Sequence, residues 1–438
     1  MKNMMKLISL VLGGLIAINT SAQDIEQCGQ KAYLEYLEEL QPGINAHIDE
    51  TFFKALSESS LKTKNTQDTI HTIQVVFHVV YNSNAENLDD ELIYSQLRIL
   101  NECFNRTNPD TVNTRDVFVP LAADAGIQFL LATVDPDGNT TDGIVRESTD
   151  LNSFSNSQIN LAYSDQVKFA EYGSVAWDTE KYLNIWVCDL SSNGFDALLG
   201  YAYPPTNAPN WTNSNSFSTS DRQGVVVHYK VVGEDNPQSL ATGSKTLIHE
   251  VGHYLGLRHI WGDGGCGVDD FMDDTPRAKR ASNGCIKGVN TCAEPTGEQY
   301  PDMLENYMDY STGECQNMFT HDQVAQMRAN LTAFRSEIYT TQRPNPPTLE
   351  LVNIIETGIH PKPVINDMTV YLAEANDSND LSFALIIVNM LGQQVYKIDL
   401  QNQPVQILSG FAGLKGAYIY IISENKNTIQ SGKIIFGY

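Results

Sequence analysis

The sequence has few basic residues and few histidines for its length. Its 438 residues include 28 Lys and Arg against 53 Asp and Glu, a formal charge of −25. Binding to nucleic acid needs clustered positive charge, so this balance argues against a nucleic-acid partner. Beyond the N-terminus no apolar run reaches the roughly 20 residues needed to span a bilayer, and no internal repeat is visible. What remains is an acidic globular chain, long enough for two or three domains.

The N-terminal residues have the order of a secretory signal peptide. Lysines precede an apolar run over residues 7–18, and small residues follow it. This order predicts a signal peptide over residues 1–22. The apolar run is too short for a membrane anchor. We therefore expect an exported chain with no transmembrane segment after signal removal, in a compartment where disulfides form.

Composition divides the rest of the chain into three parts and a linker. Residues 23–70 are polar and helix-prone, which predicts a pro-segment that ends at an exposed cleavage site. Residues 71–339 form a large domain, and residues 340–349 a Pro-rich linker. Residues 350–438 carry short alternating strands, typical of a small all-β sandwich. In the large domain we expect strands at residues 73–81, 181–190 and 223–232 and helices at residues 89–104 and 244–257.

Three of the nine histidines fall within the string HEVGHYLGLRH. On a helix His249 and His253 lie one turn apart and project to the same face. Gly256 lets the chain leave the helix at a backbone angle that other residues resist, which brings His259 back toward the first two. Three imidazoles with a fourth position left open predict a catalytic zinc site.

Glu250 follows the first of these histidines and flanks the expected ion without binding it. There it can take a proton from water and serve as the base of a hydrolytic reaction. A base of this kind has no use in a purely structural site, which argues for an enzyme. Two other functions stay open: a zinc-stabilised surface protein that binds or adheres without turnover, and hydrolysis of a non-peptide amide.

The string HExxHxxGxxH, followed by ENYMDYS, resembles the motif of the metzincin metalloproteases. The stretches IQVVFHVVY, YLNIWVCDL, LGYAYPP and DDTP extend the resemblance to the pappalysin-like group of that family. The resemblance implies an α+β catalytic domain, with a mixed sheet and helices in an upper lobe, a cleft, and an irregular lower lobe stapled by disulfides. It also implies a zinc-dependent endopeptidase acting on proteins or peptides.

The resemblance further implies roles for residues beyond the histidines. Met308 would form a hydrophobic floor beneath the metal, and Tyr310 would bind zinc or stabilise the tetrahedral intermediate. Glu314 would lie at the base of the S1′ pocket and select Arg or Lys after the scissile bond. The disulfides implied by the order of cysteines in the group are Cys266–Cys292 and Cys285–Cys315.

An acidic run, DDFMDDTP, follows the histidine motif. Asp270 and Asp274 stand four residues apart before a turn, and Thr275 adds a further oxygen. Hard oxygen ligands suit calcium, and the resemblance implies a calcium ion at this segment, beside the active site. A solvated acidic loop without an ion stays the alternative.

Cys28, in EQCGQ, lies in the expected pro-segment. A thiolate can fill the open zinc position and exclude water, which would keep the enzyme latent as a zymogen. The resemblance includes a comparable Cys-Gly pair. The alternative is a disulfide with Cys103 or Cys188, and the odd total of seven cysteines leaves at least one thiol without an internal partner.

The C-terminal domain resembles the sorting domain of the type IX secretion system. The stretches IHPKPVINDMTVYL, VNMLGQQVYKI and LKGAYIYIISENKNTIQSGKIIF carry the resemblance in that order. It implies a Gram-negative bacterium, passage through the periplasm, and delivery by the type IX machinery to the cell surface or the medium.

Overall fold

The structure is a computed structural model of the whole chain. The residues that it describes are 28–40, 42–43, 45–46, 50, 69–156, 160–192, 195–196, 198–205, 222–240, 245–294, 297, 299–342, 358–360, 368–371, 382–389, 393–401, 405–408, 411, 414, 416–425 and 427–436. The expected signal peptide lies outside them, as do residues 343–349 of the expected linker. Within the described part, no helix has the length and apolar character needed to cross a membrane.

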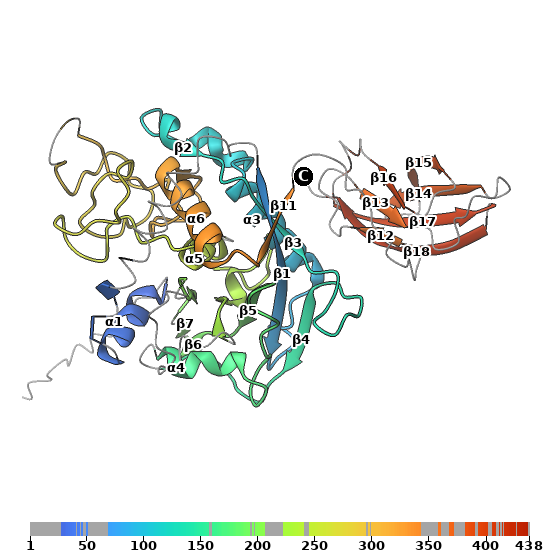
Figure 1. Cartoon of the computed structure of the whole chain (residues 1–438), viewed down its shortest axis with the longest axis horizontal. Helices are drawn as coiled ribbons and strands as arrows, with labels where there is room; N and C mark the ends of the chain where they lie inside the picture. The colour runs from blue at the N-terminus through green and yellow to red at the C-terminus, as the bar shows by residue number, and fades with distance from the viewer. Residues whose placement is uncertain are drawn as a thin grey trace, which may run out of the picture.

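A seven-stranded mixed sheet forms the centre of the large domain (Figure 1). Its main path runs β11–β1–β5–β9–β8, and β3 and β4 also pair with β1. Strands β1, β3, β4, β5 and β9 run parallel, whereas β11 pairs antiparallel with β1, and β8 pairs antiparallel with β9 at one edge of the sheet. The bounds are β1 (Ile70–Tyr81), β3 (Ile127–Leu131), β4 (Ile144–Ser148), β5 (Leu183–Cys188), β8 (Gly200–Ala202), β9 (Val225–His228) and β11 (Tyr339–Gln342).

The central strands are buried on both faces, because apolar side chains cover the sheet on either side. All described residues of β5 and β9 are buried, as a parallel sheet between two layers requires. Helix α3 (Asp90–Phe104) places one apolar stripe in the core that it shares with β1 and α5 (Thr246–Tyr254). The residues of that stripe are Ile93, Leu97, Leu100 and Phe104.

Helices and short strands complete the structure around the sheet. In the large domain the remaining helices are α4 (Leu161–Ser164) and α6 (His321–Phe334), and the short strands are β2 (Ala122–Ala123), β6 (Ser191–Ser192), β7 (Phe195–Asp196) and β10 (Phe319–Thr320). Helix α1 (Gln30–Leu40) belongs to the expected pro-segment. Helix α6 begins with a capping box, in which Thr320 and Gln323 each accept a hydrogen bond from the other's backbone amide. Single 3₁₀ turns cover Pro109–Asn113, Val119–Leu121, Asp165–Lys168 and Tyr229–Val231.

The segment between α5 and β10 is irregular. Its described residues form turns and one isolated bridge, Asn306 with Met318. Two disulfides cross-link it, Cys266–Cys292 and Cys285–Cys315, which is the pairing that the family resemblance implied. Cross-links of this kind restrict a segment that lacks a ladder of backbone hydrogen bonds.

Two antiparallel sheets form the C-terminal region, drawn in orange to red in Figure 1. One has the order β12–β13–β16 and the other β15–β14–β17–β18, and Val370 of the first shares a core with Phe383 and Leu385 of the second. The expected all-β region is confirmed. The bounds are β12 (Gly358–His360), β13 (Met368–Tyr371), β14 (Phe383–Asn389), β15 (Gln394–Leu400), β16 (Val405–Leu408), β17 (Gly416–Glu424) and β18 (Asn427–Phe436).

Three predicted boundaries differ from the observed ones. The linker was expected from residue 340, but residues 339–342 form β11, because they pair with the start of β1. The strand expected over residues 223–232 ends at His228, where a 3₁₀ turn follows. Helix α5 ends at Tyr254 rather than at residue 257, because Gly256 has a positive φ of 93° that no helix contains.

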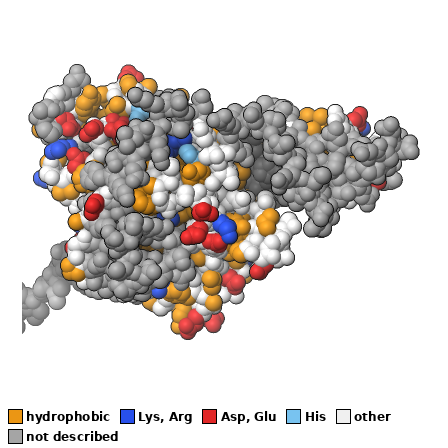
Figure 2. All heavy atoms as spheres, viewed as in Figure 1, with side chains coloured by type: hydrophobic (Ala, Val, Ile, Leu, Met, Phe, Trp, Pro, Cys, Tyr) orange, Lys and Arg blue, Asp and Glu red, His pale blue; other side chains and the backbone are white. Residues whose placement is uncertain are grey.

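The surface agrees with the acidic composition. On the face in Figure 2, acidic side chains are spread over several parts of the large domain, with few lysines and arginines among them. No basic patch is visible among the described residues on this face.

Candidate metal centre and active site

Helix α5 and the turn after it bring three imidazoles together. The Nε2 atom of His253 lies 3.0 Å from that of His249 and 3.1 Å from that of His259, and the last two are 3.3 Å apart. Ligands held tetrahedrally at the usual zinc–nitrogen distance would stand about 3.3 Å from one another. The observed separations therefore fit a single zinc ion.

Each ring is oriented by a contact at its other nitrogen. His249 Nδ1 lies 2.7 Å from the carbonyl oxygen of Tyr307, and His253 Nδ1 lies 2.8 Å from that of Leu257. Because these carbonyls only accept, each Nδ1 donates and each Nε2 lone pair points to the shared centre. Burial lowers the pKa of His249 to about 3 and the pKa of His253 well below its usual value, so both rings are neutral. Neutral imidazoles with converging lone pairs are the donor set that zinc takes.

The third histidine is held by residues that follow it. His259 Nδ1 contacts the Asp263 carboxylate at 2.7 Å, and the Trp261 ring stacks on the imidazole at 4.2 Å between centroids. Sequence reasoning missed both residues. The position of Asp263, four residues after a predicted ligand, was the available signal for it.

Glycines let other groups approach the centre. A Cβ atom at Gly252 would lie 2.5 Å from the Met308 sulfur, so this glycine gives Met308 its place against α5. Met308 is fully buried, as a floor beneath the histidines requires. A Cβ atom at Gly200, on the edge strand β8, would lie 2.8 Å from Cγ of Glu250. Neither role of these glycines was predicted.

Glu250 is completely buried beside the histidines. Its Oε2 lies 3.5 Å from the Cys28 sulfur, and its Oε1 has no hydrogen-bond partner among the described residues. Burial raises the pKa of this carboxyl group well above its usual value. A buried carboxylate with one free oxygen is suited to accept a proton from a small molecule.

Cys28 lies at the same centre, although it is 222 residues from Glu250 in the sequence. Its sulfur and one ring nitrogen of each histidine all lie within 4.8 Å of one another, which makes this the one candidate metal-binding group found in the described part of the chain. The alternative of a disulfide is contradicted, because Cys28, Cys103 and Cys188 are all free and buried.

Backbone contacts hold the Cys28 segment against the edge strand. The Gly29 amide donates to the Gly200 carbonyl oxygen at 2.9 Å. A Cβ atom at Gly29 would lie 3.0 Å from Cβ of Tyr201, so only glycine fits this close approach without a shift. The residue after Cys28 is thus fixed by β8.

Tyr310 lies beside the histidines, half-buried. Its ring centroid is 5.0 Å from that of His259 and 5.7 Å from that of His249, and its hydroxyl donates to the Cys28 carbonyl oxygen at 3.4 Å. The hydroxyl therefore contacts the backbone of the segment that carries Cys28.

Comparisons with known proteins agree with this geometry. The family model for peptidase M43, described as pregnancy-associated plasma protein-A, matches residues 162–332. Extracellular metalloprotease 1 of Coccidioides posadasii is 30% identical over 271 residues, which cover 60% of this chain and 78% of the relative. This chain belongs to the peptidase M43 family. It is a metalloendopeptidase.

Solved structures support the assignment. Mature mirolysin of Tannerella forsythia, in complex with a cleaved peptide, is 41% identical to this M43 peptidase with a TM-score of 0.54, over 61% of this chain and 95% of that one. A mutant of promirolysin from the same organism is 37% identical with a TM-score of 0.60, over 72% of this chain and 97% of that one. The predicted resemblance to the pappalysin-like metalloproteases is thereby confirmed at the level of the family.

One predicted site residue of this M43 peptidase is in a different place. Glu314 was expected at the base of a buried pocket, but its side chain is exposed and lies 3.5 Å from the Thr312 hydroxyl. The next residue, Cys315, is buried in a disulfide. The small cavity beside His249 is lined instead by residues that include Asp309, whose Oδ2 has no hydrogen-bond partner among the described residues.

The expected calcium ligands lie within the irregular segment but face different partners. The Asp270 carboxylate is buried and accepts from the Thr275 hydroxyl at 2.8 Å. Asp274 instead accepts from the Asp322 amide at the start of α6, at 2.9 Å. The two carboxylates therefore do not form a metal-binding group with a third His, Cys, Asp or Glu in the described part of the chain.

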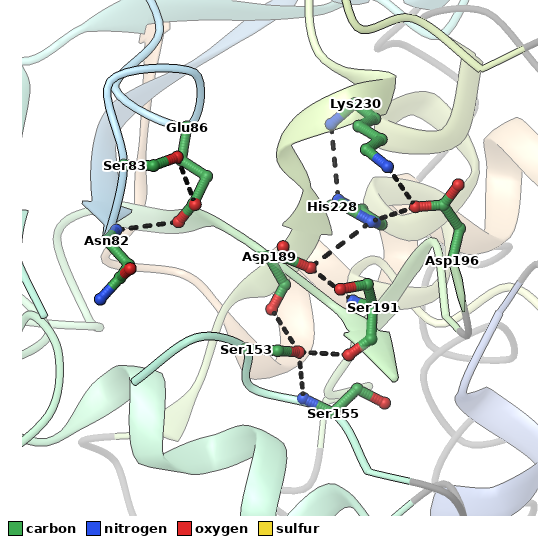
Figure 3. A network of polar contacts seen from close by, with 10 residues as sticks. All are labelled: Asn82, Ser83, Glu86, Ser153, Ser155, Asp189, Ser191, Asp196, His228 and Lys230. Carbon is green, nitrogen blue, oxygen red and sulfur yellow. Dashed lines mark hydrogen bonds and ion pairs between the residues drawn. The ribbon is translucent and has the colours of Figure 1, made fainter. Parts of the chain in front are cut away.

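A network of polar contacts connects the segment before β8 with the end of β9 (Figure 3). The Asp196 carboxylate contacts His228 Nε2 at 3.1 Å and Lys230 Nζ at 2.6 Å. The hydrogen bond to His228 and the ammonium of Lys230 lower the pKa of Asp196 to about 2. The His228 amide donates to the Leu199 carbonyl oxygen at 2.8 Å. These contacts fix the chain immediately before Gly200.

Proposed function

We propose that this chain is a secreted zinc endopeptidase made as a latent precursor. The convergence of three neutral imidazoles beside the buried Glu250 carries the proposal. Relatives named extracellular metalloproteases, from Coccidioides posadasii and Pyricularia oryzae, support secretion. The cleaved peptide bound to mature mirolysin supports peptides as substrates.

His249, His253 and His259 would hold the zinc ion, which would supply Lewis acidity for the hydrolysis. Glu250 holds the attacking water through its free Oε1, takes one proton from it, and delivers that proton to the leaving amine. The Tyr310 hydroxyl donates a hydrogen bond to the oxyanion that develops on the substrate. Burial raises the pKa of the Glu250 carboxyl group, which makes its ionised form a stronger proton acceptor.

Latency follows from the position of Cys28. Its sulfur lies beside the three histidines and against Glu250, so it would fill the fourth position of a bound zinc ion and exclude both the water and a peptide. The Gly29–Gly200 hydrogen bond occupies the edge of β8, where an extended substrate would otherwise pair. Removal of the segment that carries Cys28 would activate the enzyme.

The decisive experiment compares the Glu250→Ala variant with the wild type after removal of the pro-segment. We expect cleavage of casein or a fluorogenic peptide to disappear while zinc content stays stoichiometric. Glu147→Ala, at an exposed position of β4, serves as the matched control and should keep full activity. Full activity of Glu250→Ala would refute the mechanism. Absence of activity in the wild type as well would favour the zinc-stabilised binding protein instead.

We also propose a preference for Arg or Lys at P1′, but we assign it to Asp309 and not to Glu314. Asp309 places an unpartnered carboxylate oxygen in the cavity beside His249, so it replaces Glu314 as the acidic group that would meet an Arg or Lys side chain. Sequencing of peptides from a complex digest should show Arg or Lys after the cut bond. An even distribution at P1′ would exclude the preference, and an equal effect of Glu314→Gln and Asp309→Asn would exclude the assignment to Asp309.

Calcium binding rests on one observation. Asp270 is a buried carboxylate beside the Thr275 hydroxyl, and backbone oxygens of the same turn could complete an oxygen site. Removal of calcium should then lower the thermal stability.

Export by the type IX machinery to the surface or medium of a Gram-negative cell rests on the order of motifs in the C-terminal β region. Deletion of residues 350–438 in a host that has this machinery should leave the protein in the periplasm. Undiminished secretion of the shortened chain would contradict the assignment.

A further inference from the structure

Tyr33 is completely buried although it belongs to the expected pro-segment. It lies on α1, and its ring centroid is 4.6 Å from that of Tyr203 in the large domain. The two rings share one buried cluster with Leu161, Trp186 and Tyr201. A pro-segment that only delivered a thiol to the metal centre would not need to bury an aromatic ring in the body of the enzyme.

The side chains of Tyr201 and Tyr203, which surround Tyr33, are held in place by contacts within the large domain. The hydroxyl groups of Tyr201 and Tyr203 both donate to the Asp165 carboxylate, the first at 3.0 Å. Lys168 Nζ lies 2.8 Å from the same carboxylate, and both charged groups are fully buried. None of these contacts involves the pro-segment, so the large domain itself supports the side chains of Tyr201 and Tyr203.

Tyr33 contacts these side chains through its aromatic ring and not through its hydroxyl group. Its hydroxyl is buried and has no hydrogen-bond partner among the described residues. Burial and the Asp165 charge raise the pKa of this hydroxyl, so it stays neutral. The ring provides apolar contact area and an aromatic pair, whereas the hydroxyl provides no compensating bond.

The aromatic cluster adjoins the edge strand that holds Cys28. Gly200 binds the Gly29 amide, and Tyr201 and Tyr203 follow it in the chain. Helix α1 continues directly from this contact, since the Tyr33 amide donates to the Gly29 carbonyl oxygen at 2.9 Å. One short segment therefore connects the thiol at the metal centre with the ring in the cluster.

We propose that Leu161, Tyr201 and Tyr203 form an aromatic-binding pocket beside β8, and that Tyr33 in this pocket is a second anchor of the latent pro-segment. The proposal rests on the latency assigned to Cys28 above. The Cys28 thiol blocks catalysis, and the Tyr33 ring determines how often the pro-segment dissociates and carries the thiol away from the metal centre. Its ligand is an aromatic side chain that needs no hydrogen-bonding group.

The test measures the rate at which the Cys28 thiol reacts with an alkylating agent in the full-length chain, with and without a zinc chelator. Mass spectrometry of peptides assigns the label to each cysteine. Three variants are compared with the wild type: Tyr33→Ala, Tyr33→Phe, and Glu35→Ala as an exposed control on the same helix. Cys103 and Cys188 are buried in the large domain and report its unfolding.

We expect Tyr33→Ala to accelerate labelling of Cys28 by on the order of 100-fold, the lower end of what truncation of a buried aromatic residue causes. Tyr33→Phe should label at the wild-type rate or more slowly, because it removes a buried hydroxyl that has no partner. Labelling of Cys103 and Cys188 should not change in any variant.

Two results would overturn the proposal. Wild-type labelling of Cys28 in Tyr33→Ala would show that the ring does not hold the segment. Acceleration in Tyr33→Phe equal to that in Tyr33→Ala would show that the hydroxyl, and not the ring, is bound. Because alkylation needs no catalysis, either result leaves the proposed peptidase activity to be decided by the Glu250 variant.

Discussion

The ion pair between Arg115 and Glu305 gives a stability prediction of definite size. Arg115 Nε and Nη2 contact the two carboxylate oxygens of Glu305 at 2.6 and 2.7 Å. The glutamate side chain is 1% exposed and the arginine 15%. Replacing the arginine with Met leaves a buried carboxylate without its cation. Loss of one partner of a buried pair costs about 3–5 kcal/mol, and we take about 3 kcal/mol because the arginine keeps some solvent contact.

For a domain of this size that loss corresponds to a fall in Tm of roughly 6–12 °C. Circular dichroism of Arg115→Met, Glu305→Gln and the double variant measures it. The double variant should be less destabilised than the sum of the single ones, because it has no unpaired charge. Lys181→Met is the control, since the pair of Lys181 with Asp178 is exposed on both sides and an exposed pair contributes little to stability.

The reasoning would be refuted if Arg115→Met melted like the control or if the single effects were additive. The pair also bears on the active site, because Glu305 leads into the turn that carries Met308, and the Tyr307 carbonyl oxygen of that turn orients His249. A destabilised turn should therefore lower zinc retention on dilution as well as Tm.

Three further variants or treatments test the centre and its surroundings. Asp263→Asn should weaken zinc binding by about 10- to 100-fold, because it removes the carboxylate that orients His259; competition with a chromophoric chelator measures this, and unchanged affinity would contradict it. Gly200→Ala should lower kcat by about 10- to 100-fold at full zinc occupancy, because the added methyl group displaces Glu250; a normal kcat would show that the carboxylate is not held there. Chelation of calcium with zinc saturating should lower Tm in the wild type but not in Asp270→Asn, whereas identical melting with and without chelator would exclude the calcium site.

The parts of the fold that sequence reasoning found are those with a local cause. The spacing of the three histidines and Gly256 predicted a convergent donor set, because a helical turn and one positive φ are decided within eleven residues. The apolar stripe of α3 and the β-branched run of β1 are local patterns of the same kind. The ends of these elements were less well predicted, as the pairing of residues 339–342 with β1 illustrates, because long-range pairing decides them.

The parts that were missed depend on contacts between distant segments. Nothing in the sequence around Gly200 indicates that Glu250 lies against it, because the two residues meet only when β8 closes the edge of the sheet. The exposure of Glu314 beside the buried Cys315 likewise has no signal in the local sequence, because the fold of the irregular segment decides which side chains are buried. Tyr33 reads as one apolar position of an amphipathic helix until the cluster that contains Tyr203 is known.

Gly200 joins catalysis and latency at one position. Its missing side chain leaves room for Glu250, and its carbonyl oxygen accepts the bond that holds the residue after Cys28. The hydrogen bond to the Gly200 carbonyl oxygen does not itself depend on a side chain at this position. An added Cβ atom, however, would lie 3.0 Å from the Val226 oxygen of β9 and would press on both Glu250 and the β9 backbone. A shift of β8 that relieves this contact moves the carbonyl away from Gly29 as well. Substitutions here should therefore change the activity of the mature enzyme and the retention of its pro-segment together, whereas changes at Tyr33 should affect retention alone.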